Sequence, residues 1–241
     1  MAEKVAEKAP KKTGKKAAAR ATPAPHPYHH GSLAPALVEA ALALIAETQD
    51  WTFSLREVAR RAGVSHNAPY KHFAEKRDLL AAVAARGFEA LAGHMRASLD
   101  GVAGARARLL AVGRAYVAHG VANPALYRLM FSAALTSPGA GRPDVEKAAA
   151  AQARAVVDAV IAEGVRAGTF PQSIANPRES AAAALALWSA LHGLAMLAID
   201  DFVGPAAEVE TLVEPVLGAL IDGLALRPRA LPAGIWIAPR V

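Results

Sequence analysis

The chain has 241 residues, enough for one or two domains with a buried core. It contains no cysteine, which excludes disulfide frameworks, thiol nucleophiles and cysteine-bound zinc or iron–sulfur sites. Hydrophobic residues make up 54% of the chain but aromatic residues only 5%, so much of the apolar fraction is alanine, the strongest helix former. This composition predicts an all-α fold.

The net charge of +6 is concentrated near the N-terminus. Residues 1–30 hold seven Lys or Arg and two Glu, a net charge of +5, which leaves +1 for the rest of the chain. Residues 1–27 are rich in Lys, Ala and Pro and have no apolar period, so we expect a disordered basic arm. No apolar stretch follows these charges as it does in a secretory signal, and we expect a cytoplasmic protein.

A helix-turn-helix is predicted in the N-terminal third of the chain. Ser54 and Glu57 have the spacing of a capping box, which begins a helix that Gly63 is expected to end in a left-handed conformation. A further short helix is expected over residues 65–73, with Pro69 at the edge of its first turn, where a missing N–H costs little. Two short helices joined by a tight turn are typical of this motif.

Apolar periodicity and the breaks made by Gly, Pro and Asn predict the remaining helices. They are expected from Ser32 to just before Asp50, from Lys76 onward, and over approximately 103–122, 123–135, 143–168, 176–200 and 207–226. The apolar run 181–199 is just long enough to span a bilayer. It is mostly alanine, contains Ser189 and His192, and ends in two aspartates, so a buried helix is the better interpretation and no membrane association is expected.

Several motifs resemble the N-terminal domain of TetR/AcrR-family transcriptional regulators. They lie within residues 28–90 and comprise Tyr28–Gly31, Ser54–Ala59, Ala62–Ser65 and Tyr70–Phe73, with Lys76 and Leu80. Downstream, residues 123–127 and 188–193 resemble the C-terminal domain class named for its Trp-His-Gly signature.

The resemblance implies an all-α homodimer with a helix-turn-helix DNA-binding domain over 28–76, an effector-binding and dimerisation domain over 77–226, and a C-terminal tail over 227–241. It implies a sequence-specific regulator, most often a repressor, which a small-molecule effector releases from a palindromic operator. It implies neither an enzyme nor a bound cofactor.

Side chains suited to DNA contact gather around the predicted turn. The first residues of a recognition helix meet base edges, where Asn suits adenine, Lys suits guanine and Ala suits the thymine methyl group. The resemblance implies that other side chains, at positions that match the family pattern, would contact DNA phosphates. Tyr70 and Phe73 could instead pack in the domain core, an interpretation favoured for Phe73 but not for Tyr70. The predicted DNA contacts are Tyr28, His29, His30, Ser54, Arg56, Ser65, His66, Asn67, Ala68, Tyr70, Lys71, His72 and Lys76.

Neighbouring histidines near residue 30 could suggest a metal site, since imidazole is a common ligand. No carboxylate lies near them in the sequence, so no metal is predicted. Aromatic, histidine and methionine side chains downstream are candidates for an apolar effector pocket, with plain core packing as the alternative. They are Tyr116, His119, Tyr127, Met130, Phe131, Trp188, His192 and Met196, of which the last three share one helical face.

The helices near 176–200 and 207–226 are the predicted dimer interface, because their apolar faces exceed what one domain needs to bury. A non-specific, nucleoid-associated dimer dominated by the basic arm is the alternative function. The sequence contains no Gly-x-Ser-x-Gly elbow, His-Glu-x-x-His or phosphate loop that would indicate an enzyme.

Overall fold

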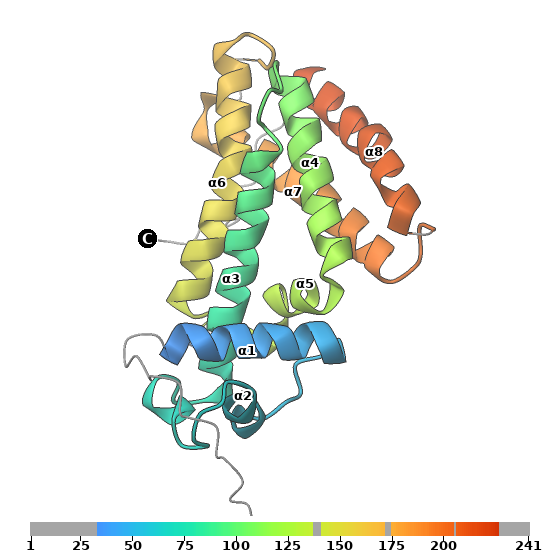
Figure 1. The fold of residues 1–241 in the computed structure, drawn as a ribbon. Helices are drawn as coiled ribbons and strands as arrows, with labels where there is room; N and C mark the ends of the chain where they lie inside the picture. The colour runs from blue at the N-terminus through green and yellow to red at the C-terminus, as the bar shows by residue number, and fades with distance from the viewer. Residues whose placement is uncertain (1–32, 137–140, 172–174, 205, 227–241) are drawn as a thin grey trace, which may run out of the picture. The chain divides into compact units, whose positions relative to one another are not determined.

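The computed structural model describes residues 33–136, 141–171, 175–204 and 206–226, and within these ranges the chain forms eight α-helices, two short 3₁₀ helices and no strand (Figure 1). The prediction of an all-α fold is confirmed. These helices belong to one structural unit, which begins at Ser32. The predicted arm, residues 28–31, the predicted cap Ser32 and the tail over 227–241 lie outside the described residues.

Three N-terminal elements form the predicted helix-turn-helix region: α1 (Leu33–Thr48), α2 (Leu55–Arg61) and the 3₁₀ helix η1 (Pro69–Lys71). The capping box is present, since Ser54 Oγ accepts a hydrogen bond from the Glu57 N–H at 3.2 Å and the Ser54 N–H donates to Glu57 Oε2 at 2.6 Å. After α2, Gly63 has a φ of 69°, a conformation that favours glycine.

The full helix predicted over residues 65–73 is wrong, because only η1 forms there. In an α-helix capped by Ser65, residue 69 would be the first to donate its N–H to the Ser65 carbonyl, and proline has no N–H to donate. The Ala68 N–H donates to that carbonyl instead, at 2.9 Å, with the i→i−3 spacing of a 3₁₀ turn. Residues 65–73, called the recognition segment from here on, therefore contain a short 3₁₀ turn in place of a full α-helix.

A long helix, α3 (Lys76–Ala97), connects this region to the remaining helices. It packs most extensively on α6 (Asp144–Arg166) and also on α4 (Ala105–Ala122). One apolar face of α3 is buried, and it comprises Leu80, Val83, Ala84, Phe88, Leu91 and Met95. α3 begins at Lys76, the last residue of the predicted DNA-binding domain, and it contacts α1 as well as α4 and α6, so it connects the N-terminal elements to the later helices.

The helix predicted over 123–135 is split into α5 (Pro124–Met130) and the 3₁₀ helix η2 (Ala133–Leu135). Ser132 lies between them, and its hydroxyl accepts a hydrogen bond from the Ala134 N–H at 3.0 Å. A serine side chain that bonds to a nearby backbone N–H competes with helix continuation. The predicted element was therefore too long.

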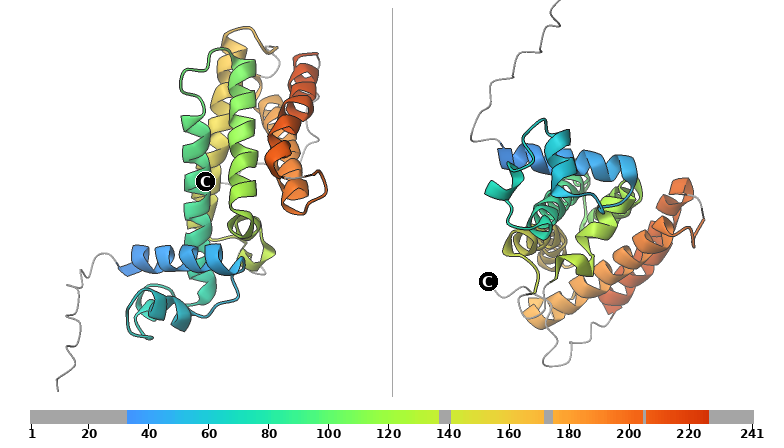
Figure 2. Two further views of the ribbon diagram at one scale, coloured as in Figure 1. Left: turned by 45° about the vertical axis from the view of Figure 1, so that its right-hand side comes forward. Right: turned by 90° about the horizontal axis from the view of Figure 1, so that it is seen from below.

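The last two helices, α7 (Pro177–Ile199) and α8 (Ala206–Leu226), both pack against α4 and against each other, and α7 also contacts α6 (Figures 1 and 2). The helices α4 and α8 can approach each other closely because Gly113 of α4 has no side chain. A Cβ at this position would lie 2.5 Å from a methyl group of Leu217 on α8. These two helices thus form one outer side of the helical unit.

Candidate functional sites

Most of the predicted DNA-contacting side chains that the structure describes lie on the surface around α2 and η1. Tyr70 is 52% exposed, whereas Phe73 is buried in the core, as its alternative interpretation predicted. Lys76 is half-buried and lies 5.2 Å from the centre of the Phe53 ring. The exposed members of the predicted set are Ser54, Arg56, Ser65, His66, Asn67, Tyr70, Lys71 and His72.

Ala68 differs from its neighbours because its side chain is buried in the hydrophobic core. The tight turn at η1 rotates this methyl group inward, so it is not available to a thymine methyl group in this conformation. The Ser54 hydroxyl is already engaged, since it also donates to Glu57 Oε2 at 2.8 Å. A phosphate contact by Ser54 would have to compete with the capping box.

Residues 52–77, which contain the predicted helix-turn-helix, carry a net positive charge, although one of their cationic side chains is paired with a carboxylate of α1. Residues 52–77 contain six Lys or Arg and two Glu, a net charge of +4. The Arg61 guanidinium forms an ion pair with Glu47 and so connects α2 to α1, while Arg56, Arg60 and Lys71 are exposed. This pairing raises the pKa of Arg61 and lowers that of Glu47. The remaining exposed cations suit a phosphate backbone.

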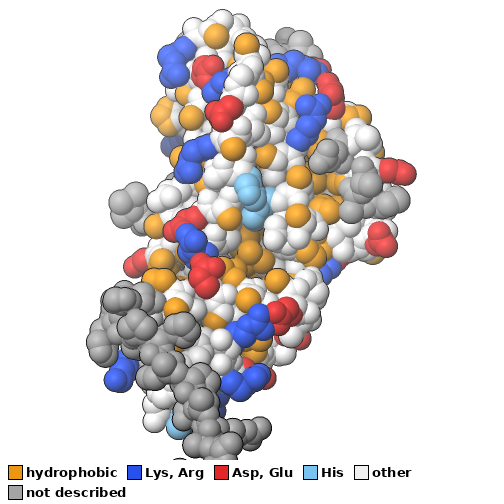
Figure 3. All heavy atoms as spheres, in the orientation of Figure 1, with side chains coloured by type: hydrophobic (Ala, Val, Ile, Leu, Met, Phe, Trp, Pro, Cys, Tyr) orange, Lys and Arg blue, Asp and Glu red, His pale blue; other side chains and the backbone are white. Residues whose placement is uncertain are grey.

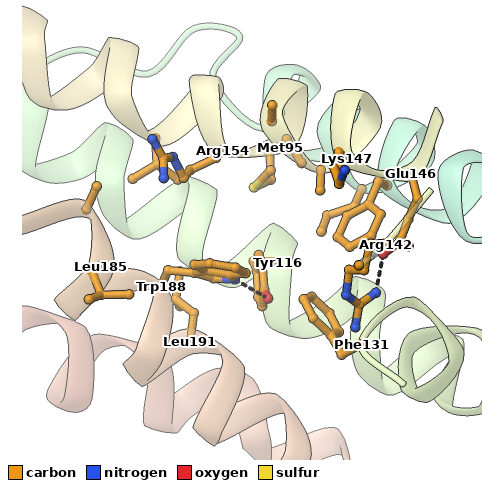
Figure 4. A pocket seen from close by; sticks show the side chains of 18 residues that line it. Met95, Tyr116, Phe131, Arg142, Glu146, Lys147, Arg154, Leu185, Trp188 and Leu191 are labelled. Atoms are coloured by element: carbon orange, nitrogen blue, oxygen red, sulfur yellow. Dashed lines mark hydrogen bonds and ion pairs between the residues drawn. The ribbon is translucent and has the colours of Figure 1, made fainter. Parts of the chain in front are cut away.

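A second candidate site is a cavity of about 510 Å³ lined mainly by residues of α3, α4, α6 and α7 (Figure 4). This volume falls within the range of about 300–1,000 Å³ that is usual for small-molecule sites. Its walls are largely apolar, and α6 adds a few charged side chains. The lining includes Phe88, Leu91, Met95, Tyr116, Phe131, Arg142, Glu146, Lys147, Arg154, Val157, Leu185, Trp188 and Leu191.

Three of the eight predicted effector-contacting residues line the cavity: Tyr116, Phe131 and Trp188. Met130 is fully buried under α3, where a Cβ on Gly87 would lie 2.6 Å from its sulfur. The other four are Tyr127, His192, His119 and Met196, and none of them lines the cavity. Of the three residues that share one face of α7, only Trp188 lines the cavity, so residue type and helical spacing did not distinguish its lining from neighbouring buried positions.

Tyr127 and His192 are linked to the cavity wall by a hydrogen-bond chain. Trp188 Nε1 donates to the Tyr116 hydroxyl at 3.0 Å, and the hydroxyls of Tyr116 and Tyr127 lie 2.9 Å apart. The Tyr127 hydroxyl is in turn 2.9 Å from His192 Nδ1. Burial raises the pKa of Tyr116 to about 12 and raises that of Tyr127, while it lowers the pKa of His192. The chain is therefore neutral at pH 7 and joins α4, α5 and α7.

His119 belongs to a different contact, between α4 and α3. Its Nδ1 lies 3.0 Å from Nδ1 of His94, and its own side chain is buried while His94 is exposed. Figure 3 shows histidine atoms at the surface in the middle of the face where α3 and α4 lie side by side in Figure 1. In the described part of the chain, no three His, Asp or Glu side chains come together as metal ligands would.

Two charged cavity residues, Arg142 and Glu146, were not predicted. Glu146 is only 1% exposed and forms an ion pair with Arg142, whose guanidinium also donates to the backbone carbonyls of Met130 and Ser132 at 3.0 and 3.1 Å. Burial raises the pKa of Glu146, and Arg142 opposes that rise. Glu146 lies in the first turn of α6, where an acidic side chain is ordinarily favourable, so no distinctive signal in the sequence could have found this pair.

The helices α7 and α8 and the connection between them expose large apolar side chains. Leu197 is 46% exposed, Val216 is 40% exposed and Phe202, in the connection between the helices, is 76% exposed. Of the helices described, α7 is long and apolar enough by length and composition to cross a membrane, and 39% of its most apolar 18-residue stretch is buried in the protein. The core helices of soluble proteins have the same length and apolar composition.

Comparisons with known proteins agree with this arrangement. Residues 37–83 match the family model described as bacterial regulatory proteins of the tetR family, and residues 109–220 match that of the tetracyclin repressor-like C-terminal domain. No curated protein is similar enough in sequence to match. A solved protein of unknown function from Rhodococcus sp. RHA1 is 32% identical, with a TM-score of 0.68, and the match covers 83% of this chain and 100% of that one.

Two solved regulators share the fold at lower identity. PfmR from Thermus thermophilus, a TetR-family transcriptional regulator, is 21% identical with a TM-score of 0.54, over 78% of this chain and 98% of that one. FadR from Bacillus subtilis, solved in complex with stearoyl-CoA, is 17% identical with a TM-score of 0.62, over the same shares of the two chains. With both family models matched and a helix-turn-helix followed by a helical domain, this chain belongs to the TetR family and is a DNA-binding transcriptional regulator.

Proposed function

We propose that the protein is a repressor that binds a palindromic operator as a homodimer and leaves it when a small molecule occupies the cavity. The observation that carries the proposal is the course of α3. This helix begins at Lys76, close behind the recognition segment, and its residues Phe88, Leu91 and Met95 line the cavity. A ligand that displaces this buried face would tilt a stiff helix of about 33 Å and move the recognition segment at its other end.

The homodimer would form through the outer side of α7 and α8. Exposed apolar side chains such as Leu197 and Val216 would be covered by the same face of a second copy, as a two-fold interface requires. Two copies present two recognition segments, which read two half-sites arranged as a palindrome. Such a regulator works in the cytoplasm, where bacterial DNA lies.

Base reading would rest on His66, Asn67 and Lys71, which are exposed on and before η1. The phosphate contacts would come from Arg56, Tyr70 and the other exposed members of the predicted set. The complex of Bacillus subtilis FadR with stearoyl-CoA supports a small-molecule site in this fold, although its identity of 17% does not carry the ligand over to this chain.

Fluorescence anisotropy tests the DNA-binding part of the proposal. The full-length protein is titrated into duplex DNA from the region flanking its own gene and into a random duplex of equal length. We expect the flanking duplex to bind far more tightly at physiological salt, and both affinities to fall steeply as salt is raised. Equal affinity for the two duplexes would overturn sequence-specific regulation and favour the non-specific, arm-dominated alternative.

A further inference from the structure

One acceptor atom in the cavity wall has no partner within the protein. Glu146 uses one carboxylate oxygen, Oε1, to pair with Arg142, while its other oxygen, Oε2, is buried and makes no hydrogen bond. Arg142 is fixed in place by the carbonyls of Met130 and Ser132. Figure 4 shows Arg142 and Glu146 together at one end of the cavity. The Oε2 atom of Glu146 is therefore held in place at that end of the cavity without a hydrogen-bond donor.

Buried polar atoms in proteins are almost always hydrogen bonded, because an unpaired one loses its water without compensation. A ligand that brings an O–H or N–H group to the cavity would satisfy Glu146 Oε2. A ligand that brings only acceptor atoms to the same place would meet repulsion. The unpaired oxygen thus selects for a hydrogen-bond donor.

The charge balance of the wall indicates that this donor is uncharged. Glu146 balances Arg142, Asp144 lies 3.0 Å from the ammonium group of Lys147, and Asp158 lies 3.5 Å from Arg154. Each cationic side chain that lines the cavity thus has a carboxylate beside it. A charged ligand would find no uncompensated opposite charge there, and burying an unpaired charge is costly.

The rest of the cavity favours an aromatic or otherwise rigid apolar body. The rings of Phe88 and Phe131 meet edge to face with their centres 5.3 Å apart, and the Trp188 ring lies 6.2 Å from that of Phe131. These three rings come from α3, the residue after α5, and α7. A flat apolar ligand can pack against such walls with favourable ring geometry.

We propose that the cavity binds an uncharged, hydrophobic compound whose hydroxyl group donates a hydrogen bond to Glu146 Oε2. The inference rests on the proposed effector function of this cavity and narrows its ligand class. Ligands that contact Phe88 at the same time would act directly on α3.

Four naphthalene derivatives that differ only in their polar group test the proposal on the full-length protein: 2-naphthol, 2-methoxynaphthalene, 2-naphthoate and 2-naphthylmethylammonium. Dissociation constants are measured by isothermal titration calorimetry at pH 7.5. We expect 2-naphthol to bind most tightly and at least about tenfold more tightly than the methoxy compound, because only the hydroxyl can donate to the carboxylate. Tightest binding of any of the other three compounds would overturn the proposal, as would equal binding of 2-naphthol and the methoxy compound.

The substitution Glu146→Gln locates the effect. Arg142 would retain the side-chain oxygen, so an amide NH₂ group would replace the free oxygen and turn the acceptor into a donor. The preference for 2-naphthol over 2-methoxynaphthalene should then disappear. In the matched control, Glu163→Gln, a carboxylate on the same helix that pairs with Arg108 outside the cavity is changed, and the preference should persist. An unchanged preference in folded Glu146→Gln protein would overturn the assignment to Glu146.

Circular dichroism establishes whether Glu146→Gln is folded, and if it is not, the ranking of the four compounds on the unaltered protein decides the question. DNA binding is measured on the same preparations. A wrong ranking with operator preference intact overturns the ligand class alone, whereas loss of operator preference in the unaltered protein overturns the proposed regulatory function.

Discussion

The Nδ1 atoms of His94 and His119 lie 3.0 Å apart and join the long connecting helix α3 to α4. Such a contact needs one donor and one acceptor nitrogen, so at least one of the two rings must be neutral. His119 is the buried partner, and its Nε2 has no hydrogen bond. Burial, with a smaller contribution from His94, lowers the pKa of His119 to about 4.

This depressed pKa makes the protein less stable in acid. Above its ordinary value of 6.5, His119 is neutral in both the folded and the unfolded chain and contributes nothing to the pH dependence. Below 6.5 the unfolded chain takes up a proton that the folded chain refuses until about pH 4. The free energy of unfolding should therefore fall by roughly 3 kcal/mol between pH 7 and pH 4 through this residue.

Urea unfolding at several pH values measures this fall. In His119→Gln protein the decrease between pH 7 and pH 4 should be smaller than in the unaltered protein by about that amount. Parallel pH curves for the His119→Gln and unaltered proteins would show that His119 is not kept neutral by its surroundings.

A close approach near the end of α6 gives a prediction about stability. A Cβ on Gly164 would lie 2.2 Å from the ring of Phe170 and 2.9 Å from Cβ of Ala105, both of which are buried. Gly164→Ala should therefore lower the free energy of unfolding by about 1–3 kcal/mol. Gly93, within α3, has open space around its Cβ position, so Gly93→Ala should raise it by about 0.5–1 kcal/mol. Thermal unfolding measures both variants, and we expect a lower melting temperature for Gly164→Ala and a higher one for Gly93→Ala than for the unaltered protein.

Most of the fold could be predicted because its helices begin and end at strong local signals. The capping box at Ser54, the left-handed Gly63 and the Asn-Pro starts of α5 and α7 all occur where expected. The recognition segment was the main exception. In this segment Pro69 occupies the first position whose N–H an α-helix capped by Ser65 would need. Because proline lacks that N–H, a 3₁₀ turn forms in place of the α-helix.

The cavity was less predictable, because helical periodicity identifies a buried face without telling what covers it. His119 and Tyr116 lie on the same helix and are both buried, yet one contacts α3 and the other lines the cavity. Glu146 could not be chosen from the sequence, since a glutamate in the first turn of a helix is ordinarily a favourable, solvated residue. Its burial results from packing between helices distant in the sequence.

Removing the cap of α2 should weaken the predicted helix-turn-helix. The Ser54 hydroxyl accepts the Glu57 N–H, and losing such a cap costs about 1 kcal/mol. Ser54→Ala should lower the free energy of unfolding by this amount, whereas Ser54→Thr retains the hydroxyl and most of the stability. If urea unfolding shows no difference between these two variants, the capping box does not stabilise α2.

Two variants, Asn67→Ala and Arg56→Ala, should distinguish a side chain that reads bases from one that contacts phosphates. Asn67→Ala removes an exposed amide next to η1, and should cost roughly 1–3 kcal/mol on the preferred operator while relaxing the base preference. Arg56→Ala should instead weaken binding about equally on all duplexes and reduce the slope of log affinity against log salt by about one. Anisotropy titrations on operator and random duplexes at three salt concentrations distinguish the two. A uniform loss in Asn67→Ala would remove Asn67 from the base-reading set.

The proposed dimer interface can be tested by placing a charge on its apolar face. Val216 of α8 is 40% exposed and Val145 of α6 is 53% exposed, so glutamate at either position is accommodated in a single copy of the chain. If the face formed by α7 and α8 is covered by a second copy, Val216→Glu buries two like charges near a two-fold axis and should shift the protein to monomers, while Val145→Glu remains dimeric. Sedimentation velocity at micromolar concentration measures both. Because two half-sites must be read together, monomeric Val216→Glu protein should also lose its preference for the palindrome, and a Val216→Glu dimer that keeps this preference would place the interface elsewhere.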